Sequence, residues 1–187
     1  MRRLAAVLTF VGFTFGLVAL PATALAQTTS PTTSQGTGPG PNPLVSGSFT
    51  GTSTFDYTTP TCLPFPTQVH QVFDGTYTIQ SGRTGSFHLD GCTANVTSPA
   101  GPYPYSGTFA LAAPGGATMN GTAVGSLMAV APFSDNVTLT ITLTPTGGTH
   151  EFGNVGGLVN LTGTWQSGGF PTTTGPISGS LTGALTH

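Results

Sequence analysis

A strict two-residue alternation is the feature of this sequence that most limits its fold. From Val137 to Thr144 the chain reads VTLTITLT, so every odd position is apolar and every even position is threonine. Successive side chains of a β-strand point to opposite faces, whereas an amphipathic helix repeats its apolar residues every three or four positions. The segment is therefore predicted to be a strand with one buried face and one exposed face.

The same period recurs along most of the chain from Leu44 onward. Apolar and polar residues alternate in further segments at Phe49–Tyr57, Phe73–Ile79, Phe87–Leu89, Phe109–Leu111, Met119–Leu127, Val159–Trp165 and Ile177–Leu185. Gly, Pro and Asn clusters separate about eight such segments, and none of them carries the apolar stripe of a helix. The predicted fold class is all-β.

Glycines on the apolar face of these segments favour a closed sheet. They are Gly51, Gly75, Gly107, Gly121, Gly125, Gly163, Gly179 and Gly183. Glycine weakens a strand unless the sheet bends there or another group approaches closely. A small barrel needs such bends, and its closure also removes the free edges of the sheet. We predict a single antiparallel eight-stranded β-barrel over residues 44–187, with a β-sandwich as the alternative.

Residues 1–26 have the pattern of a secretory signal peptide. Met1–Arg3 is positively charged, Leu4–Leu20 is apolar, and Ala24–Ala26 matches the small-residue cleavage pattern. The compact signal with its alanine-rich cleavage site is typical of bacteria. A retained membrane anchor is the alternative, but the apolar run is short for a membrane span. We expect a secreted or cell-envelope protein with no membrane span after cleavage.

Residues 27–43, QTTSPTTSQGTGPGPNP, have low complexity and contain no large apolar residue. A segment without apolar side chains to bury has nothing to offset the entropy of folding. This segment is predicted to be a disordered linker between the signal peptide and the barrel.

Charge is scarce in the rest of the chain. After residue 26, Arg83 is the only Lys or Arg residue. Nucleic-acid and phosphate sites need clustered basic residues, so these partners are excluded. The sequence also lacks the G-x-S-x-G, Walker and H-E-x-x-H motifs, and no cofactor or metal is predicted.

Two cysteines, Cys62 and Cys92, occur in this exported chain, and we predict a disulfide between them. In the chain-entropy description such a bond contributes about 3–4 kcal/mol. Free thiols or a metal-binding pair are the alternative, but the spacing is not that of a zinc site.

The segment Gly147–Gly157, GGTHEFGNVGG, resembles the GGTGxFxxAxG signature of the allene oxide cyclase and dirigent barrels. The chain departs from that signature at His150, where the family has glycine, and at Val155, where it has alanine. A glycine at such a position can have a backbone conformation that is costly for a side chain. The resemblance implies a barrel, in a family that includes a cyclase of an oxylipin epoxide and proteins that guide phenoxy-radical coupling. No catalytic residue of the family can be matched to this chain.

Inward-facing aromatic residues are the candidates for lining a ligand pocket. They are Phe49, Phe55, Tyr57, Phe73, Tyr77, Phe87, Phe109 and Trp165. An eight-stranded barrel is of the size at which such side chains either fill the interior or surround one small ligand. Both interpretations stay open.

Polar candidates are few. His88 and Asp90 are two residues apart and share a strand face, and with His70 or Asp74 on a neighbouring strand they would form a metal or acid–base site. The alternative, which we favour, is that all of them lie in solvent, because the aromatic residues occupy the opposite face. His150 and Glu151 are expected to form a surface pair in a turn.

Threonine rows on the outward face are a further feature, at Thr50–Thr54 and Thr138–Thr144. Such rows form a flat binding face in some proteins. Threonine is also an ordinary residue of a soluble strand face, and we favour that interpretation.

Three functions compete. The first is a non-catalytic binding or structural module outside the cell, with a small apolar ligand or a cell-wall or protein partner. The second is a cyclase, isomerase or radical-coupling guide whose apolar pocket holds a lipid or a phenolic. The third is an outer-membrane barrel with threonine inside and apolar residues toward lipid. A cavity of several hundred Å³ would favour the second function over the first.

Overall fold

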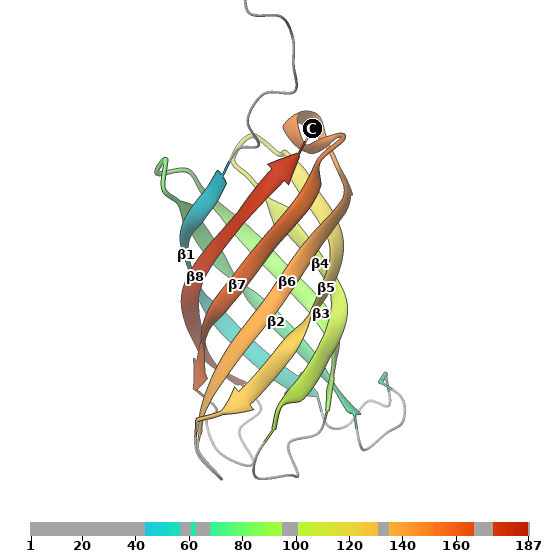
Figure 1. Ribbon diagram of the computed structural model, residues 1–187, viewed down its shortest axis with the longest axis vertical. Helices are drawn as coiled ribbons and strands as arrows, with labels where there is room; N and C mark the ends of the chain where they lie inside the picture. Colours follow the sequence, from blue (N-terminus) through green and yellow to red (C-terminus); the bar gives the residue numbers. More distant parts are fainter. Residues whose placement is uncertain are drawn as a thin grey trace, which may run out of the picture. The chain divides into compact units, whose positions relative to one another are not determined.

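The computed structural model describes residues 44–56, 61–62, 68–94, 101–130, 135–166 and 174–186. The strands in these ranges form one closed antiparallel barrel, in which each strand pairs with its neighbours in sequence and β8 returns to β1 (Figure 1). The strands are β1 (Leu44–Asp56), β2 (Gln68–Ile79), β3 (Thr84–Ala94), β4 (Tyr103–Ala112), β5 (Thr118–Ala129), β6 (Asn136–Gly148), β7 (Gly156–Gln166) and β8 (Thr174–Thr186). The predicted eight-stranded barrel is confirmed, and the β-sandwich alternative is wrong.

The seam between the first and last strands is as regular as the other pairings. Leu44 pairs with Ala184 at one end of the seam, and Thr54 pairs with Thr174 at the other. No free edge remains among the described strands, which removes the main route by which sheets associate edge to edge.

In β6 the apolar side chains face the interior and the threonines face outward, as the alternation predicts. Val137, Leu139, Ile141 and Leu143 are buried inside the barrel, while the threonines between them lie on the outer wall. The same pleat carries the inward apolar residues of the other strands into one continuous core. Apolar burial of this kind stabilises a fold by about 25 cal/mol for each Å² removed from water.

The inward glycines make room for aromatic rings of neighbouring strands. The ring of Phe87 lies over Gly75, and the ring of Phe49 lies over Gly163 and Gly179. A Cβ atom at Gly163 would also be only 2.3 Å from the carbonyl oxygen of Ser178. These glycines are therefore required for space, both for the rings and for the close approach of adjacent strands in a narrow barrel.

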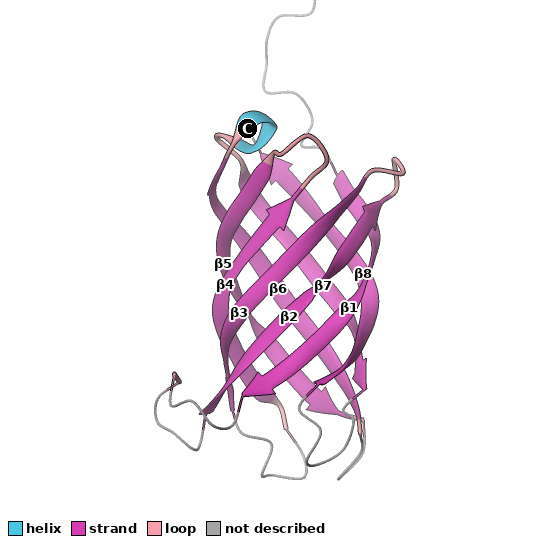
Figure 2. Ribbon diagram, turned by 180° about the vertical axis from the view of Figure 1, so that it is seen from behind, coloured by secondary structure: helices cyan, strands magenta, loops and turns pink. Residues whose placement is uncertain are grey.

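The two ends of the barrel differ in their connections (Figure 2). At one end are a hairpin over residues 80–83, a turn over 113–117 and the 3₁₀ turn η1 (His150–Phe152). At the other end Cys62 is joined to Cys92 of β3 with a Cα–Cα distance of 5.7 Å, which confirms the predicted disulfide. Of the described residues, none belongs to a helix long and apolar enough to cross a membrane. The predicted signal peptide and linker lie outside the described residues.

Candidate functional site

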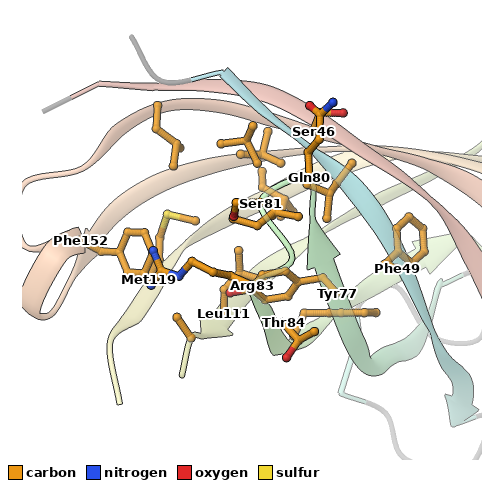
Figure 3. A pocket seen from close by; sticks show the side chains of 18 of the residues that line it. Ser46, Phe49, Tyr77, Gln80, Ser81, Arg83, Thr84, Leu111, Met119 and Phe152 are labelled. Atoms are coloured by element: carbon orange, nitrogen blue, oxygen red, sulfur yellow. The ribbon is translucent and has the colours of Figure 1, made fainter. Parts of the chain in front are cut away.

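A pocket of about 340 Å³ lies inside the end of the barrel that carries η1. Its wall is mainly apolar and includes Phe49, Tyr77, Phe87, Met119 and Phe152 (Figure 3). The volume lies within the range of pockets that enclose small molecules. The site is therefore an apolar cup at one end of the barrel.

The inner end of the cup is closed by packed side chains. Phe49 and Phe87 meet edge to face, with ring centroids 5.8 Å apart and an interplanar angle of 86°. Buried leucines of β6, β7 and β8 complete this inner end; they are Leu143, Leu161 and Leu181. Each of these residues is several positions along its strand from the mouth, so the pocket occupies only part of the interior.

An ion pair crosses the mouth of the pocket. Arg83 belongs to the hairpin between β2 and β3, and Glu151 belongs to η1 between β6 and β7. In a ring of eight strands these connections lie on opposite sides, yet Arg83 Nη2 is 2.5 Å from Glu151 Oε1. Hydrogen bonding to Glu151 and its negative charge raise the pKa of Arg83. Both side chains are about half exposed, so water surrounds the pair and it contributes little to stability.

Tyr77 lies beside this ion pair on the pocket wall. Burial raises the pKa of Tyr77, the charge of Arg83 lowers it, and the charge of Glu151 raises it. The net direction is upward, so the phenol is neutral at physiological pH and its hydroxyl is available as a hydrogen-bond donor.

Only some of the predicted pocket residues line this pocket. Phe49, Tyr77 and Phe87 do so. The others that the structure describes, Phe55, Phe73, Phe109 and Trp165, belong to the packed core instead. They do so because rings from different strands meet and fill the interior. The ring centroids of Phe55 and Trp165 are 4.7 Å apart, and those of Phe73 and Tyr105 are 5.4 Å apart. Tyr57 lies outside the described residues.

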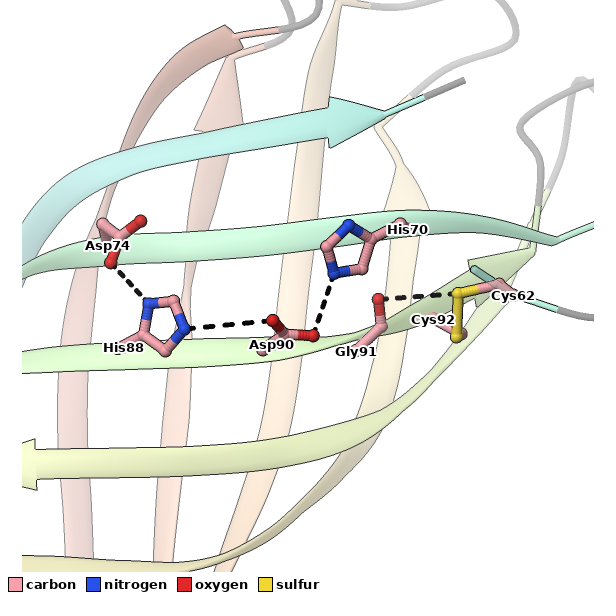
Figure 4. A network of polar contacts seen from close by, with 7 residues as sticks. All are labelled: Cys62, His70, Asp74, His88, Asp90, Gly91 and Cys92. Carbon is pink, nitrogen blue, oxygen red and sulfur yellow. Dashed lines mark hydrogen bonds and ion pairs between the residues drawn. A yellow bond between two sulfur atoms is a disulfide. The ribbon is translucent and has the colours of Figure 1, made fainter. Parts of the chain in front are cut away.

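The polar candidates come together on the outer wall, away from the pocket interior (Figure 4). Asp74 Oδ1 is 2.7 Å from His88 Nδ1, and His70 Nε2 is 2.9 Å from Asp90 Oδ1. His88 Nε2 lies 4.0 Å from Asp90 Oδ2 and links the two pairs into one row. The exposed fraction of these side chains runs from 20% for His70 to 61% for Asp74, so the row faces solvent.

No group of three or more His, Cys, Asp or Glu residues in the described ranges is arranged to hold a metal ion. The row of His and Asp side chains on β2 and β3 is thus a set of hydrogen-bonded surface pairs. This arrangement agrees with the interpretation that His70, Asp74, His88 and Asp90 lie on the solvent-facing side of the sheet.

The sequence did not indicate the ion pair at the mouth. Glu151 was expected to form a surface pair with His150, but it pairs with Arg83, 68 positions away in the chain. Arg83 is recognisable in the sequence as the only Lys or Arg residue after residue 26, but only the barrel topology shows that it lies over a pocket. His150 itself has φ 54°, a left-handed conformation that is uncommon for a residue with a side chain.

Comparison with family models, with curated proteins and with solved structures gives no match to this chain. The resemblance of Gly147–Gly157 to the allene oxide cyclase and dirigent signature therefore stays a prediction.

Proposed function

We propose that this chain is an exported barrel that binds a small, mostly apolar molecule in the pocket at one end. The observation that carries the proposal is the apolar cup of about 340 Å³ with polar groups only at its mouth. This volume lies near the lower end of the range of small-molecule pockets, about 300–1,000 Å³. Replacing water on such a wall with an apolar ligand is favourable. The proposed location outside the cell, in the medium or the envelope, rests on the signal-like residues 1–26.

Binding without catalysis is the form of this proposal that the site favours. The described ionisable residues on the pocket wall are Tyr77, Arg83 and Glu151, and all three lie at the mouth. Acid–base catalysis needs such a group within hydrogen-bond reach of the reacting atom. The deeper wall consists of apolar side chains such as Phe49 and Leu181. Such side chains pack against a ligand but do not exchange protons with it.

The second candidate is an enzyme of the cyclase or isomerase kind, or a guide for radical coupling. The presence of a cavity of this size favours it over a purely structural module. A shaped apolar cavity promotes a rearrangement by holding a flexible molecule in one reactive conformation. The two candidates differ in what happens to the ligand. A binding protein releases it unchanged, whereas an enzyme releases a rearranged product.

An outer-membrane barrel is not supported. That function requires threonine inside and apolar side chains outside. Among the described residues most large apolar side chains are inside, and Ser and Thr cover most of the outer wall. The exposed large apolar side chains are Leu44, Val124, Met128, Val130 and Leu158.

Native mass spectrometry of the protein purified from its culture medium tests the proposal. We expect a bound small molecule, released when the protein unfolds. Leu111→Trp adds a large ring to the pocket wall and should abolish the adduct, whereas Leu158→Trp adds the same ring to the outer wall and should keep it. An adduct that persists in Leu111→Trp would place the ligand elsewhere. A wild-type protein that stays empty and takes up no neutral apolar probe would rule the proposal out.

A further inference from the structure

We propose that the ligand is a compact monocarboxylic acid, whose carboxylate is recognised by Arg83 and Tyr77 at the mouth while its apolar part fills the cup. This inference rests on the proposed binding function and specifies the chemistry of the ligand. It comes from the charges and hydrogen-bond donors that surround the opening.

The first argument is the position of Arg83. It is the only Lys or Arg among the described residues, and its side chain is part of the pocket wall. Figure 3 shows it extending across the opening, beside Tyr77 and toward Phe152. A ligand that enters the cup with its apolar end first leaves its head group next to this guanidinium.

The second argument is the set of hydrogen-bond donors that Arg83 and Tyr77 present at the mouth. A guanidinium has five N–H donors, and the contact with Glu151 uses Nη2. The neutral Tyr77 hydroxyl adds one more donor on the same wall. Arginine binds a carboxylate through two parallel hydrogen bonds, which a hydroxyl or an amide head group does not match.

The third argument is that Glu151 can give up its place at little cost. Its side chain is about half exposed and belongs to the short turn η1, so its carboxylate remains hydrated when a ligand pairs with Arg83. Exposed ion pairs contribute only about 0–1 kcal/mol, so this exchange is nearly neutral. A cationic head group would have to pair with Glu151, and its charge would then lie beside the like charge of Arg83, which opposes binding.

Size and shape define the apolar part of the ligand. A volume of about 340 Å³ lies near the lower end of the range of small-molecule pockets, about 300–1,000 Å³, so the ligand is compact. Phe49, Phe87 and Phe152 face this space, and aromatic rings pack well edge to face against one another. A fused bicyclic ring fits these limits, and 2-naphthoate is a suitable fluorescent probe.

Fluorescence titration of the purified protein with three probes tests the inference. The probes are 2-naphthoate, 2-naphthol and 2-naphthylmethylamine, which present an anionic, a neutral and a cationic head group on the same ring. We expect naphthoate to bind about tenfold more tightly than naphthol, and the amine to bind most weakly. Arg83→Met should remove the preference for naphthoate over naphthol, measured as the ratio of the two dissociation constants.

Glu151→Gln should strengthen naphthoate binding, because it removes the competing carboxylate. Asp90→Asn is the matched control, since it makes the same kind of change on the outer wall and should alter no affinity. Circular dichroism of each variant verifies that the barrel is intact.

Two kinds of failure are distinguishable. Equal binding of naphthoate and naphthol, a naphthoate preference that survives Arg83→Met, or a preference for the amine would overturn the carboxylate assignment and leave the pocket as a binding site. Failure of all three probes to bind would overturn the binding function and this inference together.

Discussion

Phe49 of β1 and Gly179 of β8 are direct cross-strand partners, and the ring of Phe49 lies over the glycine. A Cβ atom at residue 179 would be 2.8 Å from Phe49 Cε1 and 2.3 Å from the carbonyl oxygen of Thr162. The aromatic ring and the absence of a side chain are thus two parts of one packing arrangement, and this arrangement also forms the inner end of the pocket.

Gly179→Ala is therefore expected to destabilise the barrel. The added methyl group meets backbone on one side and a ring on the other, and overpacking of this kind typically costs about 1–3 kcal/mol. Urea unfolding measures the change. Gly153→Ala is the control, because its nearest neighbour would be the carbonyl oxygen of His150 at an ordinary 3.4 Å. Equal stability of the two variants would contradict this account of the inward glycines.

Removal of the disulfide is expected to lower stability strongly. Cys62 and Cys92 are 30 positions apart, and a loop of this size corresponds to about 3–4 kcal/mol of unfolded-state entropy. The double substitution of both cysteines by alanine should lose this amount in urea unfolding. Wild-type protein unfolded under reducing conditions should show the same loss, and a loss below about 1 kcal/mol in both experiments would contradict the prediction.

His150→Gly is expected to stabilise the protein. His150 has φ 54°, where a side chain is sterically costly and glycine is not. The gain should be about 0.5–1 kcal/mol, measured as the shift of the urea midpoint at constant slope. His150→Ala should bring no such gain, because alanine carries the same Cβ atom. A stabilisation by alanine as large as that by glycine would assign the effect to the imidazole and not to the backbone.

Stability is expected to fall at alkaline pH because of a buried phenol. Burial raises the pKa of Tyr105 above the ordinary 10.0, and the negative charge of Asp90 raises it further. Above about pH 10 the unfolded chain ionises this group while the folded barrel keeps it protonated, so its stabilising contribution is complete below that pH and is lost as pH rises. The free energy of unfolding measured between about pH 9 and pH 11 should fall less steeply in Tyr105→Phe. Identical slopes in the two proteins would exclude Tyr105 as the cause.

His88→Ala and Asp90→Asn are expected to leave ligand binding unchanged. Both residues lie in the exposed row on β2 and β3 and take no part in the wall of the cup. The stability change should stay below about 1 kcal/mol, as is usual for exposed pairs. Loss of probe binding in either variant, with an intact circular dichroism spectrum, would show that the outer row takes part in function.

The strands could be predicted from sequence because the pleat imposes its period directly. In β6 the alternation of Val137 to Thr144 matches the buried and exposed positions of the strand. Closure was also predictable in outline, since inward glycines such as Gly163 and Gly179 make sense only where strands and rings approach closely. These signals are local, and each requires only a strand and its neighbours.

The pocket could not be predicted residue by residue. Phe49 and Phe55 have the same alternation and the same residue type, yet Phe49 lines the cup and Phe55 packs against Trp165. The difference is depth along the strand, which depends on the tilt and stagger of the closed barrel. The pairing of Arg83 with Glu151 could not be predicted for a similar reason. Only the closure of the barrel brings the β2–β3 hairpin and η1 together across the mouth.

The seam between β1 and β8 has a consequence for the order in which the barrel can assemble. Every other pairing joins strands that follow each other in the chain, so seven of the eight pairings can form as successive hairpins. Only the seam requires residues as distant as Leu44 and Ala184 to meet, and it carries the entropy of closing nearly the whole domain. Since these ends lie side by side, a circular permutant that joins them and opens another connection would keep every cross-strand pair. The pairing that carries this closure entropy would then lie at a different place in the wall.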